Sequence, residues 1–196
     1  MNLNKNKKTE LIKILRSKKT IFSFPEILLN SNTKKPKTLM QQLNYYTKTN
    51  ELYSPRKGFY SQDKKYSKLE LANKIFTPAY ISLEIVLARA GIIFQYYSQI
   101  FIISYLSREI KIDNQIYIYK KIKDTILTNS TGIKKEKNYM IASSERAFLD
   151  IMYLNKNYHF DNLSTLNWKK VFEILKIYKN KRMEKQVEKY YKKYAS

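Results

Sequence analysis

The sequence predicts a mixed α+β protein, with helices and one hairpin in residues 1–62 and a small antiparallel sheet with several helices in residues 69–196. Apolar side chains recur at helical spacing through most of the first region, whereas they alternate every second residue around 108–122. A polar, lysine-rich segment at 61–68 separates the two regions. With 43% hydrophobic residues among 196, the chain is able to bury an apolar core of ordinary size.

Two helices are expected in the first 32 residues. Residues 9–16, TELIKILR, place their apolar side chains on one face, which is typical of an amphipathic helix. In FSFPEILLNSN at 22–32, Pro25 suits a first helical turn and Glu26 complements the positive end of the helix dipole. The asparagines at the end of this segment predict that the second helix is short.

A third helix is expected to begin at Pro36 and to run through PKTLMQQLNYYTK. One face carries Leu39, Met40, Leu43 and Tyr46, and we expect it to be buried. The opposite face consists of polar and basic side chains, namely Lys37, Gln41, Asn44, Tyr45 and Lys48. This face therefore offers hydrogen-bonding groups without negative charge.

A basic hairpin is expected directly after this helix. Leu52-Tyr53 and Phe59-Tyr60 flank the sequence SPRKG, in which Pro55 favours a turn and Gly58 tolerates a positive φ. Three helices followed by a basic hairpin are the parts of a winged helix-turn-helix domain. The sequence therefore predicts such a domain for residues 1–62.

The C-terminal region is expected to mix helices with a hairpin. A helix is predicted in TPAYISLEIVLARAG at 77–91, with Ser82 as its N-cap and Gly91 just past its end. REIKIDNQIYIYKKI at 108–122 predicts two strands around an Asp113-Asn114 turn, with all its isoleucines on one face. The segments 99–106 and 138–142 are expected to join the same sheet.

Helices are also expected near the end of the chain. SSERAFLDIMYL at 143–154 predicts a helix capped by Ser143 or Ser144, in which Arg146 and Asp150, four residues apart, form a local ion pair. Two further helices are expected, and Lys185, Lys189 and Lys192 make one side of the second basic. These two helices span 167–178 and 181–194.

The charge of the chain points to a polyanionic partner. Lys and Arg number 38 against 16 Asp and Glu, which gives a net charge of +22. Residues 1–60 hold 13 of these basic side chains and 3 of the acidic ones. Such an excess attracts nucleic acid, although lysine-rich codon usage in an AT-rich genome is the other explanation.

A cytoplasmic location and no membrane partner are expected. The chain has no cysteine, which excludes disulfides and fits a reducing compartment. Its first residues show no apolar signal core. The most apolar segment, 91–106, is interrupted by Gln and Ser and is shorter than the roughly 20 residues of a spanning helix.

Double-stranded DNA is the partner that the third helix and the hairpin favour. Amide side chains on the helix are suited to reading base edges, and lysines around it are suited to neutralising phosphates. Arg56 and Lys57 are expected to contact the sugar-phosphate backbone or the minor groove. The candidate DNA-binding residues are Lys34, Lys35, Lys37, Thr38, Gln41, Gln42, Tyr45, Lys48, Arg56 and Lys57. A winged helix that binds protein instead is the alternative for these residues.

No catalytic residue, cofactor or metal site is expected. His159 is the single histidine, and no glycine-rich loop precedes a helix. The remaining enzyme hypothesis is a Mg²⁺-dependent nuclease that uses Glu109 and Lys111 with an upstream acid such as Glu84 or Asp63. Alternating charges on a solvent-facing strand explain the same triplet and are the preferred interpretation.

In five segments taken together, the chain resembles the AbiEi-like antitoxins, winged-helix transcriptional regulators of type IV toxin-antitoxin and abortive-infection systems. The segments are RKGFY (56–60), TPAYISLEIVLARAGIIFQ (77–95), SREIKI (107–112), SSERAFLDIMYLN (143–155) and YHFDNL (158–163). The resemblance implies an N-terminal domain that represses its own promoter through inverted repeats and a C-terminal antitoxin domain.

The resemblance also implies a functional counterpart, a nucleotidyltransferase toxin that forms no stable complex with its antitoxin. A stand-alone basic nucleic-acid-binding protein without a toxin partner is the alternative. Neither interpretation fixes the oligomeric state, for which a monomer or a weak dimer is expected.

Overall fold

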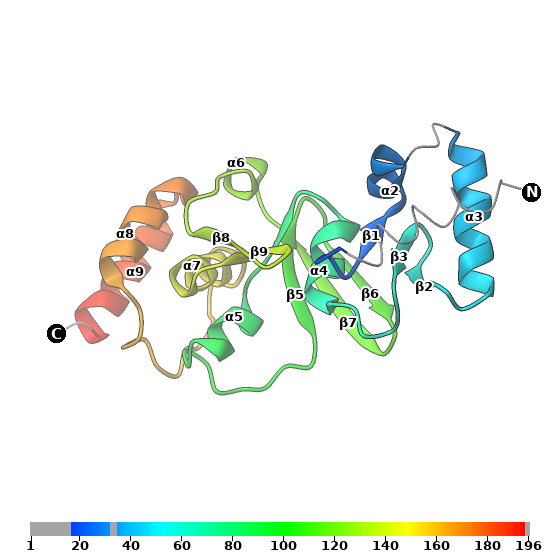
Figure 1. Ribbon diagram of the computed structural model, residues 1–196. Helices are drawn as coiled ribbons and strands as arrows, with labels where there is room; N and C mark the ends of the chain where they lie inside the picture. The colour runs from blue at the N-terminus through cyan, green and yellow to red at the C-terminus, as the bar shows by residue number, and fades with distance from the viewer. Residues whose placement is uncertain (1–16, 32–34, 195–196) are drawn as a thin grey trace, which may run out of the picture. The chain divides into compact units, whose positions relative to one another are not determined.

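The computed structural model describes residues 17–31 and 35–194 (Figure 1). These residues form a mixed α+β protein with two β-sheets, which confirms the predicted class. The chain divides between Leu71 and Ala72 into two compact units, called here the N-terminal unit and the C-terminal unit. The helix predicted at 9–16 lies outside the described residues.

Before α4 (Lys68–Ile75), the described residues of the N-terminal unit form two helices and a three-stranded antiparallel sheet with the strand order β1-β3-β2. Its elements are β1 (Phe22–Ser23), α2 (Phe24–Asn30), α3 (Pro36–Lys48), β2 (Tyr53–Arg56) and β3 (Phe59–Ser61). One apolar core holds them together, and its buried members are Phe22, Ile27, Leu39, Leu43, Leu52 and Tyr60.

Local signals in the sequence account for both helices. The Ser23 hydroxyl caps α2 by accepting from the Glu26 N–H, and the Glu26 carboxylate accepts from the Ser23 N–H, so the two residues form a capping box. Pro36 begins α3, as predicted. The predicted apolar face of α3 is wrong at Met40, which is 49% exposed, whereas Leu39 and Leu43 are each 2% exposed. Met40 stays in solvent because the core ends at the 39/43 edge of the helix.

The hairpin turns more tightly than predicted. Pro55 lies inside β2, where the pairing with β3 is irregular, so its missing N–H removes no regular ladder bond. The turn itself consists of Lys57 and Gly58, and Gly58 adopts φ +82. The Ser54 hydroxyl donates to the carbonyl oxygens of Arg56 (3.1 Å) and Phe59 (3.0 Å) and closes the tip.

The C-terminal unit contains a six-stranded sheet with the strand order β6-β7-β5-β4-β9-β8. Its strands are β4 (Ala79–Ile81), β5 (Ile100–Ser104), β6 (Arg108–Ile112), β7 (Gln115–Lys121), β8 (Ile133–Glu136) and β9 (Tyr139–Ala142). The predicted antiparallel sheet is wrong in two places, since β5 pairs with β7 and β4 pairs with β9 in parallel. These pairs join strands that are not consecutive, so the turns visible in the sequence did not reveal them.

Six α-helices accompany this sheet, and α7 packs against α5 and α8 (Figure 1). They are α4 (Lys68–Ile75), which contains the boundary between the units, α5 (Glu84–Arg89), α6 (Asp124–Leu127), α7 (Ser144–Leu154), α8 (Trp168–Leu175) and α9 (Lys181–Tyr194). A 3-10 helix, η1 (Lys176–Tyr178), follows α8. Ser143 caps α7, as predicted. None of the described helices is long and apolar enough to cross a membrane.

Two predictions for this unit need correction. Ser82 is not the N-cap of a helix, because β4 precedes it and α5 begins at Glu84 with Leu83 in the cap position. In the 108–122 hairpin the Asp113-Asn114 turn is confirmed, but the isoleucines do not share a face. Ile110 and Ile112 lie opposite Tyr117 and Gln115, so the buried face of β7 carries tyrosines instead of Ile116 and Ile118.

Truncation of Leu43 to alanine should destabilise the N-terminal unit by about 2–5 kcal/mol, the usual loss for a buried leucine. Hydrogen exchange measured on the amides of α3 reports this loss. Met40→Ala on the same helix is the matched control and should leave exchange nearly unchanged, because that side chain is 49% exposed. Equal effects of the two substitutions would contradict the assigned burial of α3.

Candidate nucleic-acid interface

The outward face of α3 gathers most of the predicted DNA-binding side chains. Lys37, Gln41 and Lys48 are exposed, and Tyr45 is 61% exposed. Thr38 and Gln42 are half-buried, because they stand beside the buried Leu39 and Leu43. The helix contains no acidic residue, so nothing on this face repels a phosphate.

The start of α3 is basic. Lys35 occupies the N-cap position, is exposed and makes no side-chain capping bond. Pro36 supplies no N–H at the first helical position, so the free N–H groups of this helix start belong to the residues that follow it in the first turn. Lys34, the remaining predicted residue here, lies outside the described residues.

The tip of the β2-β3 hairpin carries the two remaining predicted residues. Lys57 is exposed in the turn, whereas Arg56, the last residue of β2, is half-buried. The Gly58 carbonyl accepts a hydrogen bond of 2.8 Å from the N–H of Phe24, which begins α2. This bond fixes the tip to the body of the unit, so its basic side chains extend from a defined position.

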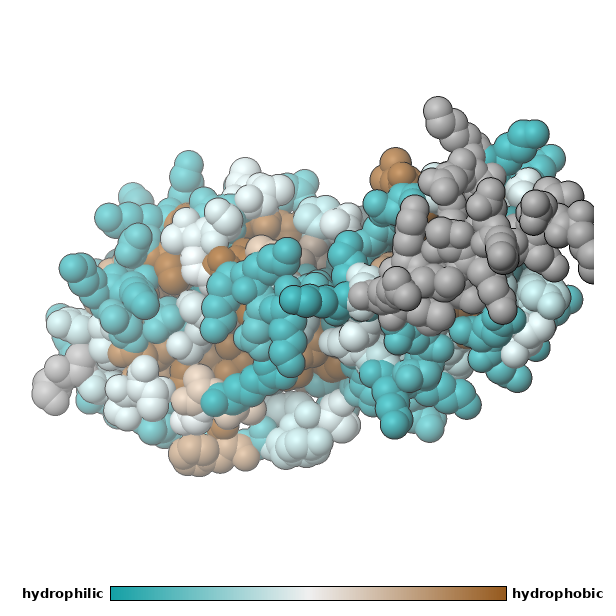
Figure 2. Space-filling model, viewed as in Figure 1, coloured by the Kyte–Doolittle hydropathy of each residue, from teal (hydrophilic) through white to brown (hydrophobic). Residues whose placement is uncertain are grey.

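A second basic surface, which no site prediction included, lies along α9. Lys156, Asn157 and one side of α9 line a groove of ≈ 720 Å³. Its basic residues are Lys156, Lys181, Arg182, Lys185, Lys189 and Lys193, and no acidic side chain lines it. Lys156 lies beside a helix that begins 25 positions later in the chain. The sequence therefore indicated the basic side of the helix but not the groove. We call this basic groove the α9 groove. Hydrophilic residues also cover much of the face of the molecule drawn in Figure 2.

The residues of the nuclease hypothesis do not form a metal cluster. Among the described residues, no group of three or more His, Asp and Glu side chains is placed to hold a metal ion. Glu109 and Lys111 are exposed on β6, and His159 is exposed beside Asp161, with 3.8 Å between its Nε2 and Asp161 Oδ1. The nuclease hypothesis therefore has no metal site to support it in this part of the chain.

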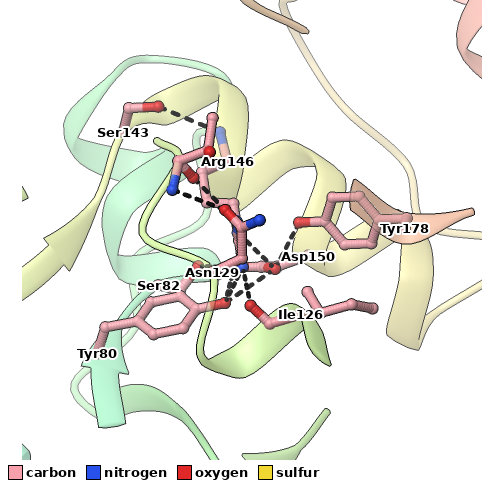
Figure 3. Close-up of polar contacts among 9 residues, drawn as sticks. Tyr80, Ser82, Ile126, Asn129, Ser143, Arg146, Asp150 and Tyr178 are labelled. Atoms are coloured by element: carbon pink, nitrogen blue, oxygen red, sulfur yellow. Dashed lines mark hydrogen bonds and ion pairs between the residues drawn. The ribbon is translucent and has the colours of Figure 1, made fainter. Parts of the chain in front are cut away.

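A buried charge network occupies the interior of the C-terminal unit (Figure 3). Arg146 and Asp150 are both 0% exposed, and the predicted ion pair is confirmed at 3.3 Å between Arg146 Nε and Asp150 Oδ1. The guanidinium also donates to the Ile126 carbonyl (2.8 Å), the Thr131 carbonyl (2.9 Å) and the Tyr80 hydroxyl (3.1 Å). Its donors are thus used by groups from three other segments of the chain.

Three hydroxyl groups complete the network around Asp150. Those of Ser82, Tyr80 and Tyr178 donate to its carboxylate oxygens at 2.8, 3.0 and 2.6 Å. Burial raises the pKa of Asp150, while Arg146 and these hydroxyls oppose the increase. Burial also raises the pKa of Tyr80 and of Tyr178 well above the ordinary value, so both phenols remain donors.

Gly132 packs closely against Arg146, a member of this network. The residue adopts φ +76, and a Cβ there would lie 2.9 Å from the Cβ of Arg146 and 2.8 Å from Ile174 Cδ1. Only glycine therefore allows the chain to pass so near α7. Because every member of the network is engaged inside the unit, we assign it a structural role.

Replacement of Asp150 by asparagine should destabilise the C-terminal unit by about 3–5 kcal/mol, because it leaves the buried Arg146 without a counter-charge. Urea denaturation followed by the fluorescence of Trp168, the single tryptophan of the chain, reports on this unit. Asp161→Asn is the matched control, since the cationic partner of Asp161, His159, is 88% exposed and the asparagine keeps an oxygen that accepts the 2.8 Å bond from the Phe94 N–H. Its effect should stay within about 1 kcal/mol. A similar small effect at Asp150 would contradict the structural role of the network.

No protein-family model matches the chain, and no curated protein is significantly similar to it. The resemblance to the AbiEi-like antitoxins therefore depends on the five sequence segments named above.

Proposed function

We propose that the protein is a sequence-specific DNA-binding transcriptional regulator whose N-terminal unit is a winged helix-turn-helix domain. The observation that carries this proposal is the outward face of α3, which presents amide, hydroxyl and lysine side chains and no carboxylate. Such a face pairs with base edges and phosphates in the major groove.

The order of elements in the N-terminal unit supports the same assignment. A strand, two helices and a hairpin follow one another, and the last strand of the hairpin, β3, returns to pair with β1. This order supports the proposal, because a recognition helix followed by a wing is the order expected of a winged helix-turn-helix domain. In this proposal α3 is the recognition helix and the β2-β3 hairpin is the wing.

The two parts have different roles in recognition. Lys37, Thr38, Gln41 and Tyr45 enter the major groove, and Gln41 reads a base edge through its amide. Arg56 and Lys57 contact the flanking backbone, where they add affinity without choosing a sequence. The apolar side chains of Leu39 and Leu43 hold α3 in place.

The wider role follows from the resemblance to the AbiEi-like antitoxins. We propose that the operator consists of inverted repeats upstream of the protein's own gene, so that the protein represses its own synthesis. The functional counterpart is a nucleotidyltransferase toxin, which the C-terminal unit counters without a stable complex. The protein acts in the cytoplasm in this account.

A non-specific nucleic-acid-binding protein is the second candidate, and the α9 groove is the observation that favours it. Six cationic side chains line this groove without an acid. Their attraction to phosphates is independent of sequence and falls steeply with salt. The two candidates differ in which surface supplies most of the affinity.

Alanine substitutions on α3 and on the hairpin should have different effects on binding. Gln41→Ala should change base preference, with a loss of about 1–3 kcal/mol of discrimination at one position. Lys57→Ala should weaken binding to all duplexes alike and lower the salt slope by about one unit, because it removes one phosphate contact. Titration of operator and random duplexes at several salt concentrations measures both effects.

Two further variants separate the candidates. Lys169→Ala, an exposed lysine on α8, is the control and should change neither quantity appreciably. The double variant Lys185→Ala, Lys189→Ala removes charge from the α9 groove and should leave base preference unchanged. Equal losses on operator and random DNA for both Gln41→Ala and Lys57→Ala would contradict the assignment of α3 as the recognition helix.

A further inference from the structure

The α9 groove has two walls from different parts of the chain. One wall is the basic side of α9, and the other is formed by Lys156 and Asn157, which follow α7. The Gln186 side-chain N–H donates to the Lys156 carbonyl at 3.2 Å and joins the two walls. On another side of α9, Met183 and Val187 are buried and hold the helix on the unit. The groove is therefore a defined recess of the fold.

Four lysines form a row along the groove wall of α9, and we call them the lysine row. Lys181, Lys185, Lys189 and Lys193 are each four positions apart, so the helix rises by about 6 Å from one to the next and by about 18 Å over the row. All four are exposed, and the ammonium group of Lys193 lies 5.0 Å from the centroid of the Tyr194 ring. A linear polyanion matches this line of charges better than a single phosphate does.

The lysine row destabilises the free helix. Like charges four positions apart on a helix repel each other. Among the described residues, no acid forms an ion pair with Lys181, Lys185 or Lys189. The two acids of α9, Glu184 and Glu188, do not line the groove. Phosphates placed beside the row would reduce the repulsion, so a bound polyanion should stabilise α9.

The shape of the recess favours one polynucleotide strand over a duplex. Its volume of ≈ 720 Å³ is in the range of sites that enclose small ligands and gives room for a short length of one strand. Duplex DNA is stiff over about 150 base pairs and does not bend into such a recess. Proteins reach duplex bases with an element that projects into a DNA groove, whereas here Lys156 stands on the wall opposite the lysine row.

An aromatic ring lines the same groove. Tyr190 is half-buried, and its ring makes T-shaped contacts with those of Phe148 and Phe160, with centroids 6.1 and 5.8 Å apart. These contacts hold the ring in place at the groove. Proteins that bind single strands without sequence preference combine a cationic groove with aromatic side chains.

We propose that the α9 groove binds a single polynucleotide strand through its phosphates, without regard to sequence. The phosphates contact the lysine row, with Arg182 and Lys156 beside it, and the nucleosides lie near Tyr190. Charge alone attracts any nucleic acid, and the recess selects the single strand. The site does not depend on the role proposed for α3, since all its residues belong to the C-terminal unit.

Fluorescence anisotropy of a labelled oligouridylate of about 12 nucleotides, a length within the usual range of single-strand sites, tests the proposal on the full chain. The strand should bind at low salt, and oligothymidylate of the same length should displace it equally well, because phosphates make the contacts. A random duplex with the same number of phosphates should displace it at least about tenfold less effectively. Absence of binding, or equal displacement by the duplex, would overturn the proposal.

Two variants with the same loss of charge test the location of the site. Lys185→Ala with Lys189→Ala should weaken strand binding at least about tenfold and lower the salt slope by about 1.4, since each phosphate contact of a single strand contributes about 0.7. Lys169→Ala with Lys170→Ala removes two exposed lysines of α8 that do not line the groove, and both values should stay nearly unchanged. Equal losses in the two variants would refute the site, because net charge would then explain the affinity.

Hydrogen exchange distinguishes this site from the α3 surface. A bound strand should slow the exchange of the α9 amides several-fold, because it reduces the repulsion within the lysine row. The amides of α3 should be unaffected, and Gln41→Ala should not change the affinity for the strand. Slower exchange in α3 with no change in α9 would contradict the proposal, whatever the outcome for operator binding.

Discussion

The buried pair of Arg146 and Asp150 is the interaction on which the C-terminal unit depends. Two charges removed from water are stable only when each has a partner and the remaining donors and acceptors are also satisfied. In this unit β4, α6, the segment before β8 and η1 each contribute a group to the pair. The network therefore fixes the relative positions of elements that are far apart in the sequence, which a purely apolar core specifies less strictly.

The same network accounts for the turn that precedes α5. Ser82 gives its hydroxyl to Asp150 and is unavailable to cap α5, so Leu83 takes the cap position with a strained backbone. Glu84 then begins the helix with one oxygen buried and unpartnered. By contrast, the proposed DNA-binding surface depends on the apolar contacts of α3 in the N-terminal unit.

Features with a local cause could be predicted from the sequence. Pro25 with Glu26 at the start of α2, Pro36 at the start of α3, the Asp113-Asn114 turn and the Ser143 cap each act within a few residues of the element they define. Helical spacing likewise sufficed to predict the outward face of α3, although Met40 was assigned to the wrong side because spacing does not reveal where a core ends. The Arg146–Asp150 pair was expected from its four-residue spacing, but its burial was not.

Features with a distant cause escaped prediction. Ser82 resembles an N-cap until Asp150, 68 positions later, is brought to it, and the parallel strand pairs join segments that share no turn. The buried tyrosines of β7 reflect packing on neighbouring elements, such as the bond from the Tyr119 hydroxyl to the Ala72 carbonyl. The α9 groove is assembled from separate segments, so composition indicated a charge but not a site.

The central claim is that the protein recognises a particular DNA sequence through α3. DNase footprinting of the full chain on the DNA upstream of its own gene tests this claim most directly. The account predicts a protected inverted repeat at protein concentrations that leave the flanking DNA accessible. Uniform protection of the fragment, or protection that disappears at the salt concentration at which random DNA is released, would contradict it.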